Sequence, residues 1–203
     1  MGNLLQPNDL PEHPSPPADF FSRTLPVIQT SGPWFRLNPV QYSSAIYFDR
    51  SGKGRFDGEN QGYGIFYGGE DENAVFIECY GRVHGAVGVA EKDLKQRNLF
   101  SITADRELTI VDLSSNNLVK IGADARLCSG AYVIARQWAK AIWEHPLKVD
   151  GLRYRSRHDD ACFCYGLFDR VKDNLQEENL GNLIDHHPLL LSKILDRYDY
   201  ALF

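Results

Sequence analysis

The sequence lacks an excess of basic residues and any long apolar segment. Its 203 residues include 22 Lys and Arg against 27 Asp and Glu, which gives a formal charge of −5. A chain with this charge balance has little attraction for phosphate backbones, so we expect no direct binding of nucleic acid. A membrane-spanning helix needs about 20 consecutive apolar residues, and no such stretch is present. We therefore expect no membrane association.

Cysteine is also sparse, and no export signal is visible. Residues 1–20 are polar and proline-rich, without the charged start and apolar stretch of a secretory signal peptide. We therefore expect a cytoplasmic protein. Cysteines in that compartment stay reduced, so we expect no disulfide bond among the four that the chain contains. These are Cys79, Cys128, Cys162 and Cys164.

The residues that are present predict a mixed fold. Apolar residues make up 43% of the chain, enough to bury the core of one domain. Strand-like patterns cover residues 34–40, 64–67, 108–113, 151–156 and 162–168. These strands do not alternate strictly with the predicted helices. The pattern predicts an α+β fold with a central mixed or antiparallel sheet and helices packed on it.

The first predicted helix follows an aromatic strand. Asp71 or Asn73 can cap it, and its apolar residues at 74, 75, 77 and Val83 lie near helical spacing. The pattern therefore places Glu78 in a helix.

Two further helices are predicted in the second half of the chain. Apolar residues recur on one face over residues 132–142, with Ser129 as the expected cap and residues 145–146 as the end. The tail from Leu175 is amphipathic, and we expect it to pack as a final helix after Pro188.

These elements suggest three parts. Residues 1–24 form a proline-rich N-terminal arm, residues 25–172 the main domain, and residues 173–203 a C-terminal helical extension. Within the domain, residues 42–60 form a long irregular stretch with several glycines. Long ordered loops are often functional.

Three local motifs are weak on their own. The glycine-rich run 52–58 has neither the spacing of a dinucleotide fingerprint nor the Gly-Lys-Ser/Thr of a P-loop. Cys162 and Cys164 could join the histidines at 186–187, but their spacing is tighter than that of usual zinc ligands, so we expect no metal. Ser156 lacks the turn that exposes a hydrolase nucleophile, which leaves a serine hydrolase as a minor alternative.

Five segments together carry a more specific pattern. In chain order they are WFRL at 34–37, GRF at 54–56, FYG at 66–68, AVFIE at 74–78 and GLRYRSR at 151–157. Their order and spacing resemble the RES domain family, named for its Arg, Glu and Ser. The similarity runs over about residues 34–170.

The resemblance implies a fold similar to that of ADP-ribosyltransferase toxins, with NAD+ as the substrate in a cleft of the sheet. It makes residues 25–172 an NAD-binding catalytic domain. The family's functional residues fall on Arg55, Tyr67, Glu78 and Ser156, and Arg36 matches a further arginine. Family members commonly have Asn about where this chain has Cys164.

Each of these side chains suits the implied chemistry. Loss of nicotinamide leaves a ribose with oxocarbenium character, which a carboxylate such as Glu78 stabilises. The guanidinium groups of Arg36 and Arg55 match pyrophosphate oxygens. Tyr67 can stack on the nicotinamide ring or donate to the ribose, and Ser156 can hold the amide or the ribose. Without the resemblance, a solvated helix carboxylate is the more common role for a residue such as Glu78.

The first functional hypothesis is an enzyme that cleaves the nicotinamide–ribose bond of NAD+. Water as the acceptor makes it a glycohydrolase, phosphate a phosphorylase, and a protein side chain a mono-ADP-ribosyltransferase; the sequence leaves these open. The resemblance also implies the toxin of a toxin–antitoxin pair, with an Xre-type helix-turn-helix antitoxin as partner. A homodimer is left open.

The second hypothesis is a non-catalytic nucleotide-binding module with the same fold. Retention of Arg55, Tyr67, Glu78 and Ser156 favours the enzyme. The discriminating observation is whether these side chains converge on one cleft.

Overall fold

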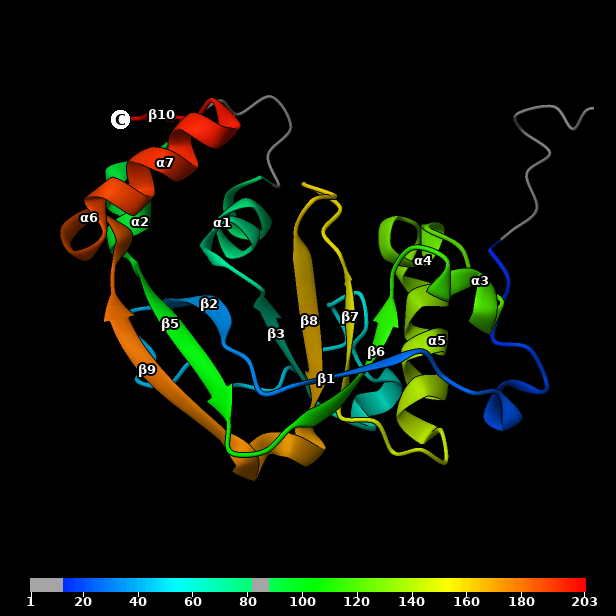
Figure 1. Cartoon of the computed structure of the whole chain (residues 1–203). Helices are drawn as coiled ribbons and strands as arrows, with labels where there is room; N and C mark the ends of the chain where they lie inside the picture. The colour runs from blue at the N-terminus through cyan, green and yellow to red at the C-terminus, as the bar shows by residue number, and fades with distance from the viewer. Residues whose placement is uncertain (1–12, 82–87) are drawn as a thin grey trace, which may run out of the picture.

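A single large sheet organises the molecule (Figure 1). The structure is a computed structural model that describes residues 13–81 and 88–203. In the described residues the sheet has eight strands in the order β1-β6-β7-β8-β3-β2-β5-β9. The strands are β1 (Val27–Thr30), β2 (Trp34–Pro39), β3 (Ile65–Gly69), β5 (Arg97–Ala104), β6 (Leu108–Leu113), β7 (Gly151–Arg155), β8 (Phe163–Phe168) and β9 (Leu175–Gly181).

The sheet is mixed but mostly antiparallel. β6 and β7 run parallel, whereas the other neighbouring strands of this sheet pair antiparallel. A separate pair joins β4 (Gly88–Val89) to β10 (Ala201–Leu202) in parallel. The helices are α1 (Glu72–Tyr80), α2 (Glu91–Lys95), α3 (Asn117–Ile121), α4 (Arg126–Ser129), α5 (Tyr132–Glu144), α6 (Leu183–His186) and α7 (Pro188–Tyr198). The predicted α+β class is confirmed.

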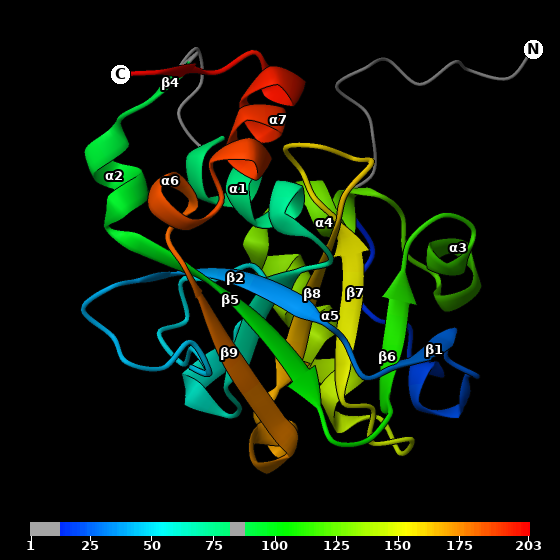
Figure 2. The same cartoon turned by 60° about the vertical axis from the view of Figure 1, so that its left-hand side comes forward.

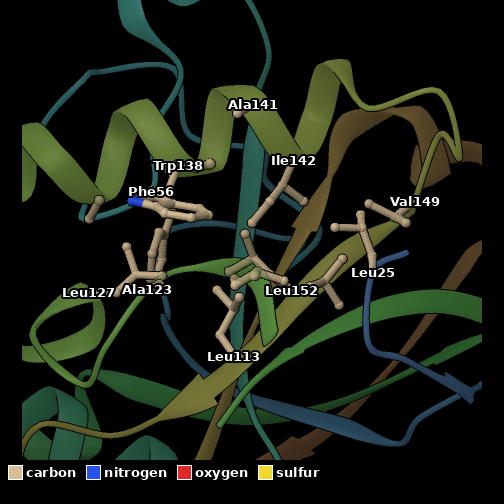
Figure 3. Close-up of a cluster of buried hydrophobic side chains, with 14 of the residues drawn as sticks. Leu25, Phe56, Leu113, Ala123, Leu127, Trp138, Ala141, Ile142, Val149 and Leu152 are labelled. Carbon is tan, nitrogen blue, oxygen red and sulfur yellow. The ribbon is translucent and has the colours of Figure 1, made fainter. Parts of the chain in front are cut away.

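Helix α5 covers β6 and β7 with its apolar face (Figure 3). Trp138 and Ile142 lie four residues apart, which places them on one side of the helix, and both are fully buried. They pack in one cluster with Phe56, Leu113 and Leu152. This cluster fixes the N-terminal end of α5 beside the loop that carries Phe56.

Helices α1, α2, α6 and α7 gather at the other end of the sheet (Figure 1). Phe76 of α1 and Ile194 of α7 are fully buried in the cluster that also contains Leu37 and Leu99 from β2 and β5. As predicted, α1 contains Glu78, and Asp71 is its cap: Oδ1 of this residue accepts a hydrogen bond from the Ala74 amide at 2.8 Å. Val83 lies outside the described residues.

The expected cap of the long helix is wrong. Helix α5 begins at Tyr132 with Ala131 before it, while Ser129 ends the preceding helix α4 and its hydroxyl donates to the Ala125 carbonyl at 3.1 Å. The extended backbone of Gly130 separates the two helices. The predicted end at residues 145–146 is confirmed, since His145 is the C-cap.

The tail from Leu175 also differs from the expectation. It begins with strand β9, which pairs with β5 at the sheet edge, and becomes helical only at α6 and α7. β9 lacks a clear alternation of apolar residues because it is an edge strand in which Leu175 alone is buried. The chain after residue 172 therefore supplies a sheet strand as well as the predicted final helix.

The described part of the N-terminal arm lies against α5. Phe20 is 1% exposed and packs edge-on against Trp138 and beside His145. The Trp138 indole donates to the Pro14 carbonyl at 2.8 Å. Residues 13–24 therefore contribute to the core around α5. Across the described chain, none of the helices has the length and apolar character needed to cross a membrane.

Candidate active site

A cavity of about 470 Å³ contains most of the residues that the sequence singled out. Arg36, Arg55, Tyr67 and Glu78 all line it. They come from β2, the loop before β3, β3 itself and α1. The other polar and aromatic residues of the wall are Asp49, Lys53, Arg97, Tyr132, Tyr154, Arg157 and His158.

The wall of this cavity is positively charged although the whole chain is acidic. Five basic side chains line it, against the two carboxylates of Asp49 and Glu78. The basic residues are Arg36, Lys53, Arg55, Arg97 and Arg157. A cleft lined with one sign of charge concentrates ligands of the opposite sign, so this one favours an anionic ligand.

Glu78 is held in place by Ser156. The Ser156 hydroxyl donates to Glu78 Oε1 at 2.7 Å, and the Cys164 thiol lies 3.8 Å from the same oxygen. Phe76 and Ile77, the two residues before Glu78 in α1, are buried and anchor the helix to the core. Glu78 itself lines the cavity. The carboxylate therefore has a fixed position at the cavity.

Ser156 lies behind Glu78 and is not part of the cavity wall. It follows β7, is 3% exposed, and its Oγ accepts hydrogen bonds from the His158 and Asp159 amides at 3.1 and 3.3 Å. These two donors direct the hydroxyl proton toward Glu78. Ser156 therefore contacts the Glu78 carboxylate, which lines the cavity, but does not line the cavity itself.

Arg55 is a buried cation with spare hydrogen-bonding capacity. Its guanidinium stacks on the Tyr132 ring at 4.5 Å, and Nη1 donates to the Gly130 carbonyl at 2.7 Å. The other terminal nitrogen, Nη2, is buried and has no hydrogen-bond partner among the described residues. A buried donor without a partner is costly, which points to an acceptor supplied by a ligand.

Tyr67 is bound to a buried carboxylate. Its hydroxyl donates to Asp57 Oδ1 at 2.8 Å and accepts from the Phe56 amide at 3.0 Å, while the Gly54 amide donates to Asp57 Oδ2 at 2.8 Å. Burial, together with the Asp57 carboxylate, raises the pKa of Tyr67 well above its usual value. The phenol therefore stays protonated and ties the loop before β3, which carries Arg55, to the sheet.

Arg36 occupies a partly enclosed position. Its guanidinium lies over the Phe66 ring at 5.2 Å, and Nη1 donates to the Tyr47 carbonyl at 3.3 Å. Burial lowers the pKa of Arg36 from its usual value, although the group keeps its charge at any physiological pH. Arg36 and Arg55 thus both present guanidinium groups at the same cavity.

Three residues that matter here had no site role predicted from the sequence: Asp57, Tyr132 and Tyr154. Asp57 is 0% exposed and follows Arg55 by two residues in a glycine-rich run. Tyr132 opens α5, and burial raises the pKa of Tyr154 in β7 well above its usual value. An acidic residue two positions after Arg55 in a glycine-rich run was the available signal for Asp57. The tyrosines reach the cavity only through tertiary packing.

Among the described residues, no group of three or more His, Cys, Asp or Glu side chains is placed to hold a metal ion. Cys162 instead contacts Asp159 and Tyr198. None of the four cysteines, all of which lie in the described residues, forms a disulfide.

Known proteins resemble this chain in fold or in sequence. A crystal structure of the M. tuberculosis MbcT–MbcA toxin–antitoxin complex contains a chain of similar fold, with a TM-score of 0.60 and 15% identity over 84% of this chain and 92% of that one. A Sinorhizobium fredii (strain NBRC 101917 / NGR234) protein named "Probable toxin y4kH" is 30% identical over 114 residues, which are 55% of this chain and 86% of that protein. The RES domain model matches residues 33–192. This chain therefore belongs to the RES domain family.

Proposed function

We propose that this protein consumes NAD+ by cleaving its nicotinamide–ribose bond and acts as the toxin of a toxin–antitoxin pair. One observation carries the proposal: Glu78, fixed by Ser156, shares a basic cavity with Arg55 and Tyr67. The volume of about 470 Å³ lies within the range of small-molecule sites, roughly 300 to 1,000 Å³.

In the proposed reaction, Glu78 stabilises the charge that develops as nicotinamide leaves. The ribose carbon loses its bond to the ring nitrogen, the bonding electrons stay with nicotinamide, and the sugar gains oxocarbenium character. A carboxylate already fixed by a hydrogen bond needs little reorganisation to stabilise that charge. The leaving group departs as a neutral ring, so the step requires no acid and no metal.

The basic residues of the cavity would bind the diphosphate of NAD+. Nη2 of Arg55 is the buried donor without a protein partner, and a phosphate oxygen would satisfy it. Arg36 lies on the same cavity and offers a second guanidinium. Since the Tyr67 hydroxyl is bound to Asp57, this residue would present its ring to the ligand rather than its proton.

We propose water or inorganic phosphate as the acceptor of the ADP-ribosyl group. With water the protein is a glycohydrolase, and with phosphate it is a phosphorylase. Transfer to a protein side chain is the alternative. The test is to incubate the purified protein with NAD+, with and without phosphate, and to identify the products. Nicotinamide with ADP-ribose indicates hydrolysis, and a phosphorylated ADP-ribose formed only with phosphate indicates phosphorolysis. Absence of nicotinamide release under every condition, a protein acceptor included, would overturn the proposal.

An antitoxin partner is part of the proposal. The support is the names of similar proteins: one is called a toxin, and the other was solved as a toxin–antitoxin complex. We propose a partner of the Xre helix-turn-helix type that covers the cavity. Co-expression of a helix-turn-helix protein that binds this chain should protect cells, and failure to form a complex with any such protein would contradict this part.

A further inference from the structure

The C-terminal helix meets the turn behind Ser156. This turn joins β7 to β8 and contains Asp159, and Figure 2 shows the C-terminal part of α7 beside it. Asp159 Oδ2 accepts hydrogen bonds from the Tyr198 hydroxyl at 2.8 Å and from Arg197 Nη2 at 2.9 Å. The Cys162 thiol lies 3.3 Å from the same oxygen. One carboxylate therefore joins the end of α7 to the turn.

Asp159 is also fixed from within its own turn. Its Oδ1 accepts from the Ala161 amide at 3.0 Å, and its own amide donates to Ser156 Oγ. Asp159 therefore binds α7 through its side chain and Ser156 through its backbone amide. A hydrogen-bonded path leads from α7 through Asp159 and Ser156 to Glu78.

Tyr198 contacts the other side of this arrangement as well. Its ring lies parallel to that of Phe76, with an interplanar angle of 3° and centroids 6.3 Å apart. Phe76 is fully buried in α1, two residues before Glu78. Tyr198 therefore contacts the helix that carries Glu78 with its ring and the turn that follows Ser156 with its hydroxyl.

From these contacts we propose that Arg197 and Tyr198 are positioning residues that set the geometry of the Ser156–Glu78 pair through Asp159. The expected effect on turnover rests on the proposed function, whereas the expected effect on the geometry of the turn does not. Neither residue lines the cavity, so neither contacts the ligand. Their loss should slow the chemical step and leave ligand binding nearly unchanged.

Three variants separate this role from general stability. Tyr198→Phe removes the hydroxyl and keeps the ring on Phe76. Arg197→Gln changes an exposed side chain, and Arg197→Lys restores the charge. The control is Tyr200→Phe, because the Tyr200 ring also packs on Phe76 but its hydroxyl donates to the Tyr80 carbonyl, away from the turn.

The first measurement is hydrogen exchange of the His158 and Asp159 amides in the full chain. We expect faster exchange in Tyr198→Phe and Arg197→Gln, no change in Tyr200→Phe and recovery in Arg197→Lys. The second is NAD+ turnover, where kcat should fall about tenfold in the first two variants while KM stays within about twofold, a loss typical of one misplaced catalytic hydrogen bond.

The outcomes are distinguishable. Unchanged amide exchange in Tyr198→Phe and Arg197→Gln would overturn the positioning role, whatever the turnover. Altered exchange with kcat equal to that of Tyr200→Phe would also overturn it. A wild-type protein without NAD+ turnover would refute the proposed function alone, and amide exchange would then decide whether α7 sets the Ser156 geometry.

Discussion

Tyr67 and Asp57 show how a single buried hydrogen bond organises the site. Asp57 has no exposed surface, and its two carboxylate oxygens accept from the Tyr67 hydroxyl and the Gly54 amide. A side chain on Gly54 would collide with this pair, since an added Cβ would lie 2.6 Å from the Tyr67 oxygen. The residue before Arg55 must therefore be glycine for the loop to close onto the sheet.

We predict that Tyr67→Phe lowers the free energy of unfolding by about 1 to 3 kcal/mol, because it leaves the buried Asp57 carboxylate without one donor. Denaturant titration measures the change. In an Asp57→Asn background, Tyr67→Phe should lower the free energy of unfolding by less, since the hydrogen bond between the two side chains is already weakened. Equal losses in both backgrounds would show that the two residues do not share a stabilising contact.

Asp159 carries a prediction about pH. Burial raises its pKa, but hydrogen bonds from Tyr198 and Arg197 outweigh burial and lower the pKa to about 2 from the ordinary 3.8. As pH falls, the unfolded chain therefore takes up this proton before the folded one. The resulting stabilisation, about 1 to 2 kcal/mol after solvent screening, is complete above about pH 5 and is lost as pH falls toward 2.

The test compares Asp159→Asn with the wild-type protein by denaturant unfolding from pH 6 to pH 3. The wild-type protein should be more stable at pH 6, and the difference should shrink toward pH 3. A difference that stays constant over this range would contradict the low pKa of Asp159.

At the scale of elements, α1 depends on its cap to present Glu78. Asp71 accepts from the Ala74 amide and also from Asn73 Nδ2 at 3.1 Å. We predict that Asp71→Ala lowers the free energy of unfolding by about 1 kcal/mol, whereas Asp71→Asn keeps most of the capping energy. Thermal unfolding distinguishes the two, and equal melting temperatures for both variants would refute a capping role.

Elements with strong local patterns were predictable from the sequence. The apolar face of α5 follows helical spacing, whereas α1 is marked by its cap and buries the consecutive residues 74–77. Strands β3, β6, β7 and β8 follow apolar runs near the predicted ranges. Strand β5 was not predicted, and β9 was taken as part of a helical tail. Strand β5 pairs with both β2 and β9, and β9 pairs with β5 at the sheet edge; local pattern does not encode such pairing.

The candidate site was predictable only through the resemblance of its segments to a family. Arg36, Arg55, Tyr67 and Glu78 were named in advance and line one cavity. The bond between Asp57 and Tyr67 and the contact of α7 with the turn at Asp159 were not predicted. These depend on contacts between residues far apart in the chain, such as Asp159 and Tyr198, for which a single sequence holds no signal.

At the scale of the whole molecule, the proposed toxin role predicts an effect in cells. Expression in a bacterium should lower cellular NAD+ and slow growth, because the substrate is shared by central metabolism. Measured NAD+ should remain normal in cells that express the Glu78→Gln variant at the same level. Normal NAD+ during good expression of the wild-type protein would contradict the toxin role.

In the proposed function, the Glu78 carboxylate drives cleavage of the nicotinamide–ribose bond. The most direct test is the rate of nicotinamide release from NAD+ by purified wild-type protein and Glu78→Gln, with Glu72→Gln from the first turn of the same helix as the control. We expect a loss of about 10² to 10³-fold for Glu78→Gln, the size expected for a transition-state charge contact, and a rate within about twofold of wild type for Glu72→Gln. Release by Glu78→Gln at the wild-type rate would contradict this role of Glu78.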